Sequence, residues 1–145
     1  MILLDTNVVS ELMKSAPEPA VMVWINTLPG STVFISAVTQ AEILYGVALV
    51  PEGKRREGLA RAARTAFETY FRGRILPFDS EAAEAFAALA AGRRQAGRPI
   101  SQADAQIAAI ARSRGADLAT RNAPDFEGCG VEIINPWGGS SKEPA

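Results

Sequence analysis

The sequence has no histidine, one cysteine and no long hydrophobic run. Without histidine there is no Ser-His-Asp triad, no Cys-His pair and no histidine-ligated zinc. The single cysteine, Cys129, excludes an internal disulfide framework and a thiolate metal cage. No apolar run reaches the length of about 18 residues that indicates a membrane-spanning helix. Acid–base or metal chemistry therefore falls to carboxylates, hydroxyls, amides, lysine or arginine.

The chain also lacks a large net charge of either sign, since its formal net charge is −1. No global positive field attracts nucleic acid, so any such binding depends on local patches. The first residues lack a basic start, an apolar segment and a cleavage site, so we expect a cytoplasmic protein without a membrane contact. The 145 residues, 48% of them hydrophobic and 21% charged, are typical of one soluble domain.

Short apolar runs alternate with helical patterns along the chain. We expect strands at residues 2–4, 32–35, 74–77, 117–120 and 131–134, and helices at residues 8–14, 20–28, 39–50, 54–71, 79–95 and 101–113. This alternation predicts a parallel sheet between two layers of helices. We expect one domain over residues 1–137 and a flexible C-terminal tail over residues 138–145.

Three acids stand where predicted strands meet predicted helices. Asp5 directly follows the first strand, while Glu42 and Asp104 lie one turn into later helices. Ligands of open parallel sheets bind beyond the carboxyl ends of the strands. A carboxylate there either holds a hard cation, acts as a nucleophile or caps the next helix. The spacings Thr39-x-x-Glu42 and Ser101-x-x-Asp104 also match the capping box, so a purely structural role stays open for each acid.

The residues that follow Glu42 and Asp104 favour the first of these roles. Both acids precede apolar runs, which indicates that their helices are buried and that their first turns face other strand ends. Carboxylates gathered in a crevice repel one another unless they share a proton or bind a cation. All-oxygen sites of this kind suit Mg²⁺ or Mn²⁺.

Four ordered motifs carry a family resemblance. They read LDTNVVSEL at residues 4–12, SAVTQAEILYG at 36–46, ADAQIAAIA at 103–111 and LATRNAPDF at 118–126. They closely resemble the PIN-domain ribonuclease family, and within it the VapC toxins of type II bacterial toxin–antitoxin systems, in particular their FitB-like branch. The closing GCGVEIINPW at residues 128–137 is similar too. The resemblance implies a three-layer α/β/α sandwich with a five-stranded parallel sheet, PIN-like and therefore Rossmann-like.

By that resemblance, Asp5, Glu42 and Asp104 are the catalytic, metal-binding acids at the carboxyl edge of the sheet. PIN domains often carry a fourth acid just after the fourth strand, and Asn122 stands there in this chain, with Asp125 three residues on. An amide oxygen ligates metal or orients water without bringing charge, so the number of metal ions stays open. Asp125 either substitutes for the fourth acid or serves as a turn residue.

Two hydroxyls and several arginines complete the candidate set. Thr6 and Thr120 are either positioners of water and metal at the same rim or plain strand-end residues. An acidic cleft repels RNA, so positive groups have to surround it. Arg121 lies beside the predicted site, and a second group of arginines lies on the helix predicted for residues 54–71: Arg55, Arg56, Arg61 and Arg64. The alternative for each arginine is a solvated helix face.

The implied function is a Mg²⁺- or Mn²⁺-dependent endoribonuclease that acts as the toxin of a toxin–antitoxin pair. Such toxins are usually dimers, held silent by a VapB- or FitA-like antitoxin through which the complex binds operator DNA. A catalytically weak or inactive PIN-like scaffold or regulatory protein is the main alternative. A haloacid-dehalogenase-type phosphatase is less favoured, because Asn7 stands where that chemistry needs a second acid. The sequence does not indicate which RNA is the substrate.

Overall fold

A computed structural model describes residues 1–138, so the predicted tail lies, from residue 139 onward, outside the described residues. The sheet has five strands: β1 (Ile2–Leu4), β2 (Val33–Ser36), β3 (Ile75–Leu76), β4 (Asp117–Ala119) and β5 (Ile133–Ile134). Their order is β3-β2-β1-β4-β5, and every neighbouring pair is parallel. The predicted five-stranded parallel sheet is therefore confirmed.

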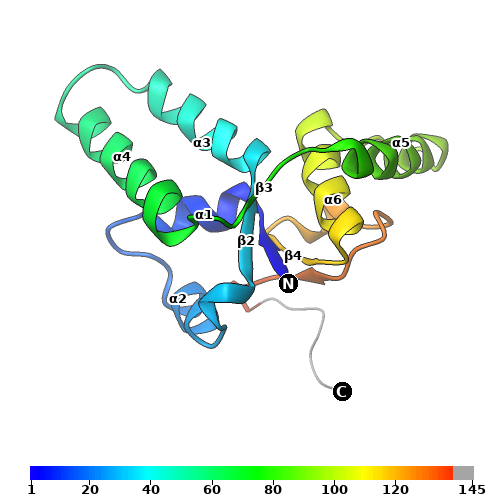
Figure 1. Ribbon diagram of the computed structural model, residues 1–145, viewed down its shortest axis with the longest axis horizontal. Helices are drawn as coiled ribbons and strands as arrows, with labels where there is room; N and C mark the ends of the chain where they lie inside the picture. The colour runs from blue at the N-terminus through cyan, green and yellow to red at the C-terminus, as the bar shows by residue number, and fades with distance from the viewer. Residues whose placement is uncertain (139–145) are drawn as a thin grey trace.

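Helices cover both faces of this sheet (Figure 1). They are α1 (Thr6–Leu12), α2 (Pro19–Asn26), α3 (Ala37–Leu49), α4 (Lys54–Thr65), α5 (Ser80–Gln95) and α6 (Gln102–Arg114). Successive strand side chains point to opposite faces. Leu3 accordingly packs with buried residues of α5 and α6, whereas Leu4 packs with those of α1, α2 and α4. The three-layer sandwich expected from the sequence is confirmed.

The first turns of α1 and α3 begin earlier than predicted, and their caps explain why. Asp5 accepts a hydrogen bond from the Thr6 amide, which starts α1 at Thr6 instead of residue 8. Ser36 caps α3, since its Oγ accepts from the Thr39 amide over 3.0 Å. Thr39 is therefore an interior residue, and the capping box predicted for Thr39 and Glu42 is wrong.

The predicted helix over residues 54–71 is regular only as far as Thr65. A π-helical turn, Ala66–Tyr70, continues it. The Phe71 amide bonds to the Ala66 carbonyl over 2.9 Å, which is the wider spacing of a π turn. Phe67 within this turn and Phe71 directly after it are both buried in the core.

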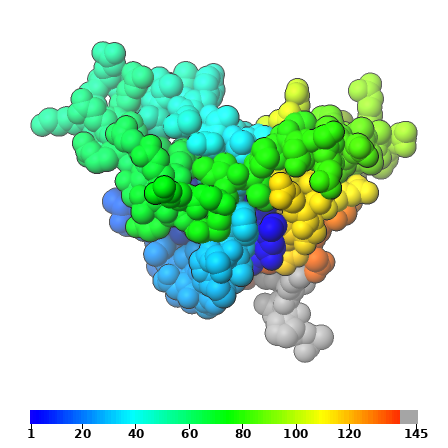
Figure 2. Space-filling model, in the orientation of Figure 1, coloured from blue at the N-terminus to red at the C-terminus, as the bar shows by residue number. Residues whose placement is uncertain are grey.

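The strand order places β1 between β2 and β4, so the residues that follow these strands share one edge of the sheet. In Figure 1, β1 rises from the N-terminus, and α3 begins at the upper end of β2. Figure 2 shows a notch at this upper edge, between the hairpin of α3 and α4 and the helices α5 and α6. Within residues 1–138 no helix combines the length and apolarity that a membrane crossing needs.

Candidate functional site at the carboxyl edge of the sheet

Asp5 lies at the end of β1 and is only 5% exposed. Its Oδ1 accepts from the Thr6 amide over 2.8 Å, so the predicted capping role is confirmed. Its Oδ2 is not used for capping: it accepts from the Thr120 hydroxyl over 2.7 Å and from Asn7 Nδ2 over 3.3 Å. The carboxylate is thus held in a fixed orientation by neutral donors.

The charge of Asp5 has no cationic partner. None of the ion pairs found in the described part of the chain includes it. The pKa of Asp5 is raised to about 6: burial raises it most, the hydrogen bonds from Thr120 and Thr6 lower it, and the charges of Asp104 and Glu42 add to the rise. A buried carboxylate that faces two other acids is a natural position for a bound cation.

Glu42 is an exposed residue in the second turn of α3, and Thr6 holds its side chain. The Thr6 hydroxyl donates to Glu42 Oε1 over 2.5 Å and lies 3.0 Å from the Thr39 hydroxyl. Since Thr6 has a single hydroxyl proton, Thr39 donates to Thr6 in this chain of bonds. Glu42 is thereby tied to the first residue of α1, next to Asp5.

Asp104 lies in the first turn of α6. Its amide donates to Ser101 Oγ over 3.2 Å, so Ser101 is the predicted N-cap. Burial raises the pKa of Asp104 above its ordinary range, and the charges of Asp125 and Glu42 act in the same direction. The side chain also contacts Ser101, which opposes that rise. Asp104 therefore stands among other negative charges at the end of the sheet.

Asp5, Glu42 and Asp104, which we call the acidic edge, are brought to one side of the molecule, yet they do not close around a single point. Within residues 1–138 no three Asp, Glu or Cys side chains are grouped tightly enough to hold one metal ion. The donor set still fits a hard divalent cation, because it consists of carboxylate oxygens and its most buried member has no counter-ion. Their role as metal ligands stays a prediction.

The segment after β4 contributes one buried hydroxyl and two exposed side chains. Thr120 is fully buried, and its hydroxyl donates to Asp5 while accepting from the Asn122 amide over 3.1 Å. Asn122 and Asp125 are exposed, and Asp125 lies in a 3-10 turn, η3 (Ala123–Phe126). The charge of Asp125 acts on Asp104, whereas Asn122 is uncharged.

The predicted arginines fall into two places. Arg121 is exposed beside the acidic edge, and its amide donates to Asn7 Oδ1 over 3.3 Å. The other four belong to α4, and one of them, Arg61, lines an apolar groove. The remaining three are Arg55, Arg56 and Arg64. Their predicted role in RNA binding stays a prediction.

That groove has a volume of about 740 Å³ and lies between α1, α2 and α4. Its wall includes Leu12 and Met13 from the end of α1, Met22 and Ile25 from α2, and Ala62 from α4. No member of the acidic edge lines it. The molecule therefore carries an apolar concave surface separate from its carboxylates.

Sequence reasoning missed two residues that support the site. Asn7 bonds to Asp5, to Thr120 and to the Arg121 amide; its only sequence signal is its place in the polar turn that opens α1. In the sequence, Arg93 belongs to a basic cluster with Arg94 and Arg98, whose alternatives are RNA phosphate contact and a solvated helix face. The structure buries Arg93, which is only 8% exposed, and no sequence pattern indicated this structural role.

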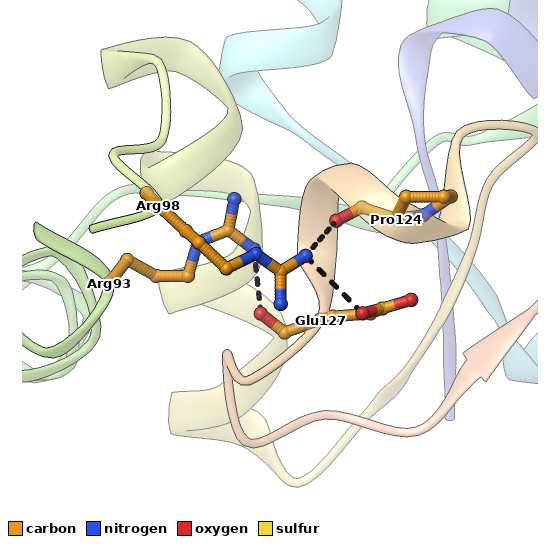
Figure 3. Close-up of polar contacts among 4 residues, drawn as sticks. All are labelled: Arg93, Arg98, Pro124 and Glu127. Atoms are coloured by element: carbon orange, nitrogen blue, oxygen red, sulfur yellow. Dashed lines mark hydrogen bonds and ion pairs between the residues drawn. The ribbon is translucent and has the colours of Figure 1, made fainter. Parts of the chain in front are cut away.

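Arg93 ties together the segments on either side of α6 (Figure 3). Its Nε donates to the Arg98 carbonyl over 2.7 Å, and its Nη1 donates to the Glu127 carbonyl over 2.6 Å. Arg98 in turn contacts the Pro124 carbonyl and the Glu127 carboxylate, each at 3.3 Å. These bonds fix the loop before α6 against the turn that carries Asp125, and so support the position of Asp104.

An open parallel sheet with acids beyond its central strands defines an α/β protein whose site lies at the strand ends. The family model of the PIN domain matches residues 2–127. The chain is 43% identical over 137 residues to the VapC ribonuclease Y4jK of Sinorhizobium fredii, covering 94% of this chain and 98% of that protein. It is 39% identical to the toxin FitB of Neisseria gonorrhoeae, covering 94% of this chain and 99% of that protein.

A solved structure agrees with these relatives. The structure of FitAB bound to the IR36 DNA fragment superposes with a TM-score of 0.90 at 37% identity, covering 99% of this chain and 100% of that chain. The chain belongs to the PIN domain family. Within that family it is similar to VapC ribonucleases and FitB toxins, as its motifs predicted.

Proposed function

We propose that this protein is a divalent-metal-dependent endoribonuclease and the toxin of a toxin–antitoxin pair. The observation that carries the proposal is Asp5, a buried carboxylate that has no cationic partner among residues 1–138 and whose pKa is raised by burial and by Asp104 and Glu42. Its membership of the PIN domain family and its likeness to a VapC ribonuclease support the choice of RNA as substrate.

Asp5 and Asp104 are the metal ligands that we favour, and Glu42 either binds the same ion or orients water. A bound Mg²⁺ or Mn²⁺ lowers the pKa of a water molecule and offsets charge on the phosphate. Thr120 keeps Oδ2 of Asp5 in place, and Thr6 does the same for Oε1 of Glu42. Fixed ligands reduce the rearrangement that binding requires.

Asp125 is our candidate for the fourth negative charge that Asn122 does not supply. Its charge acts on Asp104, and its exposed position in η3 leaves its carboxylate accessible. Asn122 is equally exposed, and its amide oxygen suits a bound water better than a tightly held second ion. One firmly bound metal ion follows from this arrangement more directly than two.

We propose two protein partners on separate surfaces. The apolar groove between α1, α2 and α4 suits an amphipathic segment of an antitoxin, and operator DNA is reached only through that antitoxin. The solved relative FitAB, which is bound to a DNA fragment, supports the expectation of an antitoxin and of operator DNA as partners. A second copy of the chain is expected against α3, where Leu44, Tyr45 and Leu49 are exposed apolar residues.

The experiment is a cleavage assay on total RNA with the full chain freed from any partner. Wild type is incubated with Mg²⁺ or Mn²⁺, with and without EDTA, beside Asp5→Asn and Asp104→Asn. The matched control is Asp117→Asn, which removes one carboxylate from the opposite end of β4. We expect cleavage that needs the metal, persists in the control and is lost in both acidic-edge variants.

Other results would change the proposal in defined ways. If no RNA is cleaved by a folded wild type, the inactive scaffold is the better account, in keeping with Asn122. If cleavage survives both Asp5→Asn and Asp104→Asn, the activity belongs to another site or to a contaminant.

A further inference from the structure

Arg121 and Trp137 form a pair beside the acidic edge. The guanidinium carbon of Arg121 lies 4.9 Å from the centroid of the Trp137 ring, within the range of a cation–π contact. The two residues follow the carboxyl ends of neighbouring strands, β4 and β5. Segments far apart in the sequence thus meet at the edge where Asp5 lies.

Both members of the pair are held by their surroundings. The Arg121 amide donates to Asn7 Oδ1, and Asn7 in turn contacts Asp5. The Trp137 amide donates to Asn135 Oδ1 over 2.9 Å, and the ring packs against the core cluster that contains Leu4. One side of the indole therefore rests on the protein core while the guanidinium covers another part of the ring.

No acceptor in the described part of the chain engages the side-chain donors of Arg121. Arg121 is exposed, and within residues 1–138 its guanidinium makes no hydrogen bond and no ion pair. The charge of Arg121 acts on Glu11, but the Glu11 carboxylate is bonded to Lys14 and to the Glu18 amide. A guanidinium has five N–H donors in a planar fork that fits a phosphate.

We propose that Arg121 binds a backbone phosphate of single-stranded RNA next to the bond that is cut, and that Trp137 is a positioning residue for it. The inference rests on the proposed function. Trp137 restricts a flexible side chain to one place, so less entropy is lost when the phosphate binds. Single-strand binding surfaces also combine positively charged side chains with aromatic ones.

The test measures RNA binding apart from cleavage. The full chain, freed from any partner, is titrated into a short fluorescein-labelled single-stranded RNA of mixed sequence in EDTA, and anisotropy is followed at several salt concentrations. Arg121→Ala, Trp137→Leu, Trp137→Phe and the Arg121→Ala/Trp137→Leu double variant are compared with wild type. Arg94→Ala is the matched control, because Arg94 is an exposed arginine of α5 outside the acidic edge.

We expect Arg121→Ala to weaken binding about tenfold and to lower the salt slope by about 0.7, the share of one phosphate contact. Trp137→Leu should weaken binding about two- to fivefold, and Trp137→Phe should restore part of that loss. The double variant should bind like Arg121→Ala alone, because Trp137 acts through Arg121. Arg94→Ala should bind almost like wild type.

Tryptophan fluorescence gives a readout that a merely structural role would not change. Trp24→Phe leaves Trp137 as the single tryptophan, since the sequence has two. RNA should change the emission of Trp137 in this background, and Arg121→Ala should remove that change. Circular dichroism establishes that each variant is folded.

The possible outcomes distinguish a failure of this inference from a failure of the proposed function. If wild type cleaves RNA with metal but Arg121→Ala binds RNA as Arg94→Ala does, the pair has no such role and the proposed function stands. Losses that add in the double variant would refute positioning by Trp137. If wild type neither binds nor cleaves RNA, both the function and the inference are wrong.

Discussion

Replacing Asp5 by asparagine should make the metal-free protein more stable at neutral pH. The carboxylate is 5% exposed, bears no ion pair within the described chain and faces Asp104 and Glu42. Asparagine keeps the shape of the side chain and can still cap α1 through its amide oxygen. The substitution therefore removes a buried charge while leaving most of the packing in place.

The size of the effect follows from the pKa of Asp5, which burial raises from 3.8 to about 6. A gap of about two pKa units corresponds to roughly 3 kcal/mol, which is the free energy that ionising Asp5 removes from the folded state. Because the pKa of Asp5 is raised in the folded state, these roughly 3 kcal/mol are fully present in the unfolding free energy of wild type below about pH 4. They are lost as pH rises through about 6.

Asparagine recovers only part of this energy. Its amide nitrogen, placed at Oδ2, can donate to the Thr120 hydroxyl but meets Asn7 Nδ2, another donor, now 3.3 Å from Oδ2. A misplaced polar contact of this kind costs about 1 kcal/mol. We therefore expect a net gain of about 2 kcal/mol in the free energy of unfolding.

Urea unfolding in EDTA at about pH 8 and about pH 4 measures this difference, since a gain of about 2 kcal/mol moves the midpoint by about 1 M urea. The control is Glu11→Gln. Lys14 and the Glu18 amide lower the pKa of Glu11. The stability that the Glu11 carboxylate contributes to the protein is therefore present above the ordinary pKa of Glu and is lost as pH falls. Glu11→Gln should accordingly destabilise the protein at about pH 8.

A different pattern would refute this reasoning. If Asp5→Asn is no more stable than wild type at neutral pH, the charge of Asp5 is already compensated in solution. If its advantage is equally large in acid, where both forms of residue 5 are neutral, the gain does not come from the carboxylate.

Three further results are expected. At a metal concentration too low to saturate the site, cleavage should fall about tenfold per pH unit below about 6, because protons compete with the metal for Asp5, and a pH profile of kcat/KM measures this. Arg93→Met should cost roughly 2–4 kcal/mol in urea unfolding, since it removes both carbonyl bonds of a buried guanidinium; an unchanged midpoint would show that those bonds add nothing. Gly130→Ala should lower the melting temperature, because Gly130 has φ +78° and a Cβ there lies 3.2 Å from Arg112 Nε; the strain is about 1–2 kcal/mol.

The order of strands and helices was predictable from the sequence because each segment carries its own periodicity. Where a boundary was wrong, the cause lay outside the segment. Ser36 caps α3 in place of Thr39, and this depends on where β2 ends in the sheet. The π turn at Ala66–Tyr70 likewise has no signal in the periodicity of its own segment.

The acids of the candidate site were predictable from their places after strands, and their motifs pointed to the family. Their partners were not. Thr6 bonds to Glu42 and Thr120 bonds to Asp5 across 36 and 115 residues of sequence, respectively. Contacts between residues this far apart depend on the spatial order of the strands in the sheet, which differs from their order along the chain. The same holds for Arg93, whose bonds join loops that only the folded chain brings together.

The central claim is that the acidic edge binds a divalent cation, and a direct titration of Mn²⁺ followed by electron paramagnetic resonance tests it without RNA. We predict one firmly bound Mn²⁺ per chain in wild type and in Asp117→Asn, and a large loss of affinity in Asp5→Asn and Asp104→Asn. Equal Mn²⁺ binding by wild type and Asp5→Asn, or no binding by any folded variant, would contradict the account.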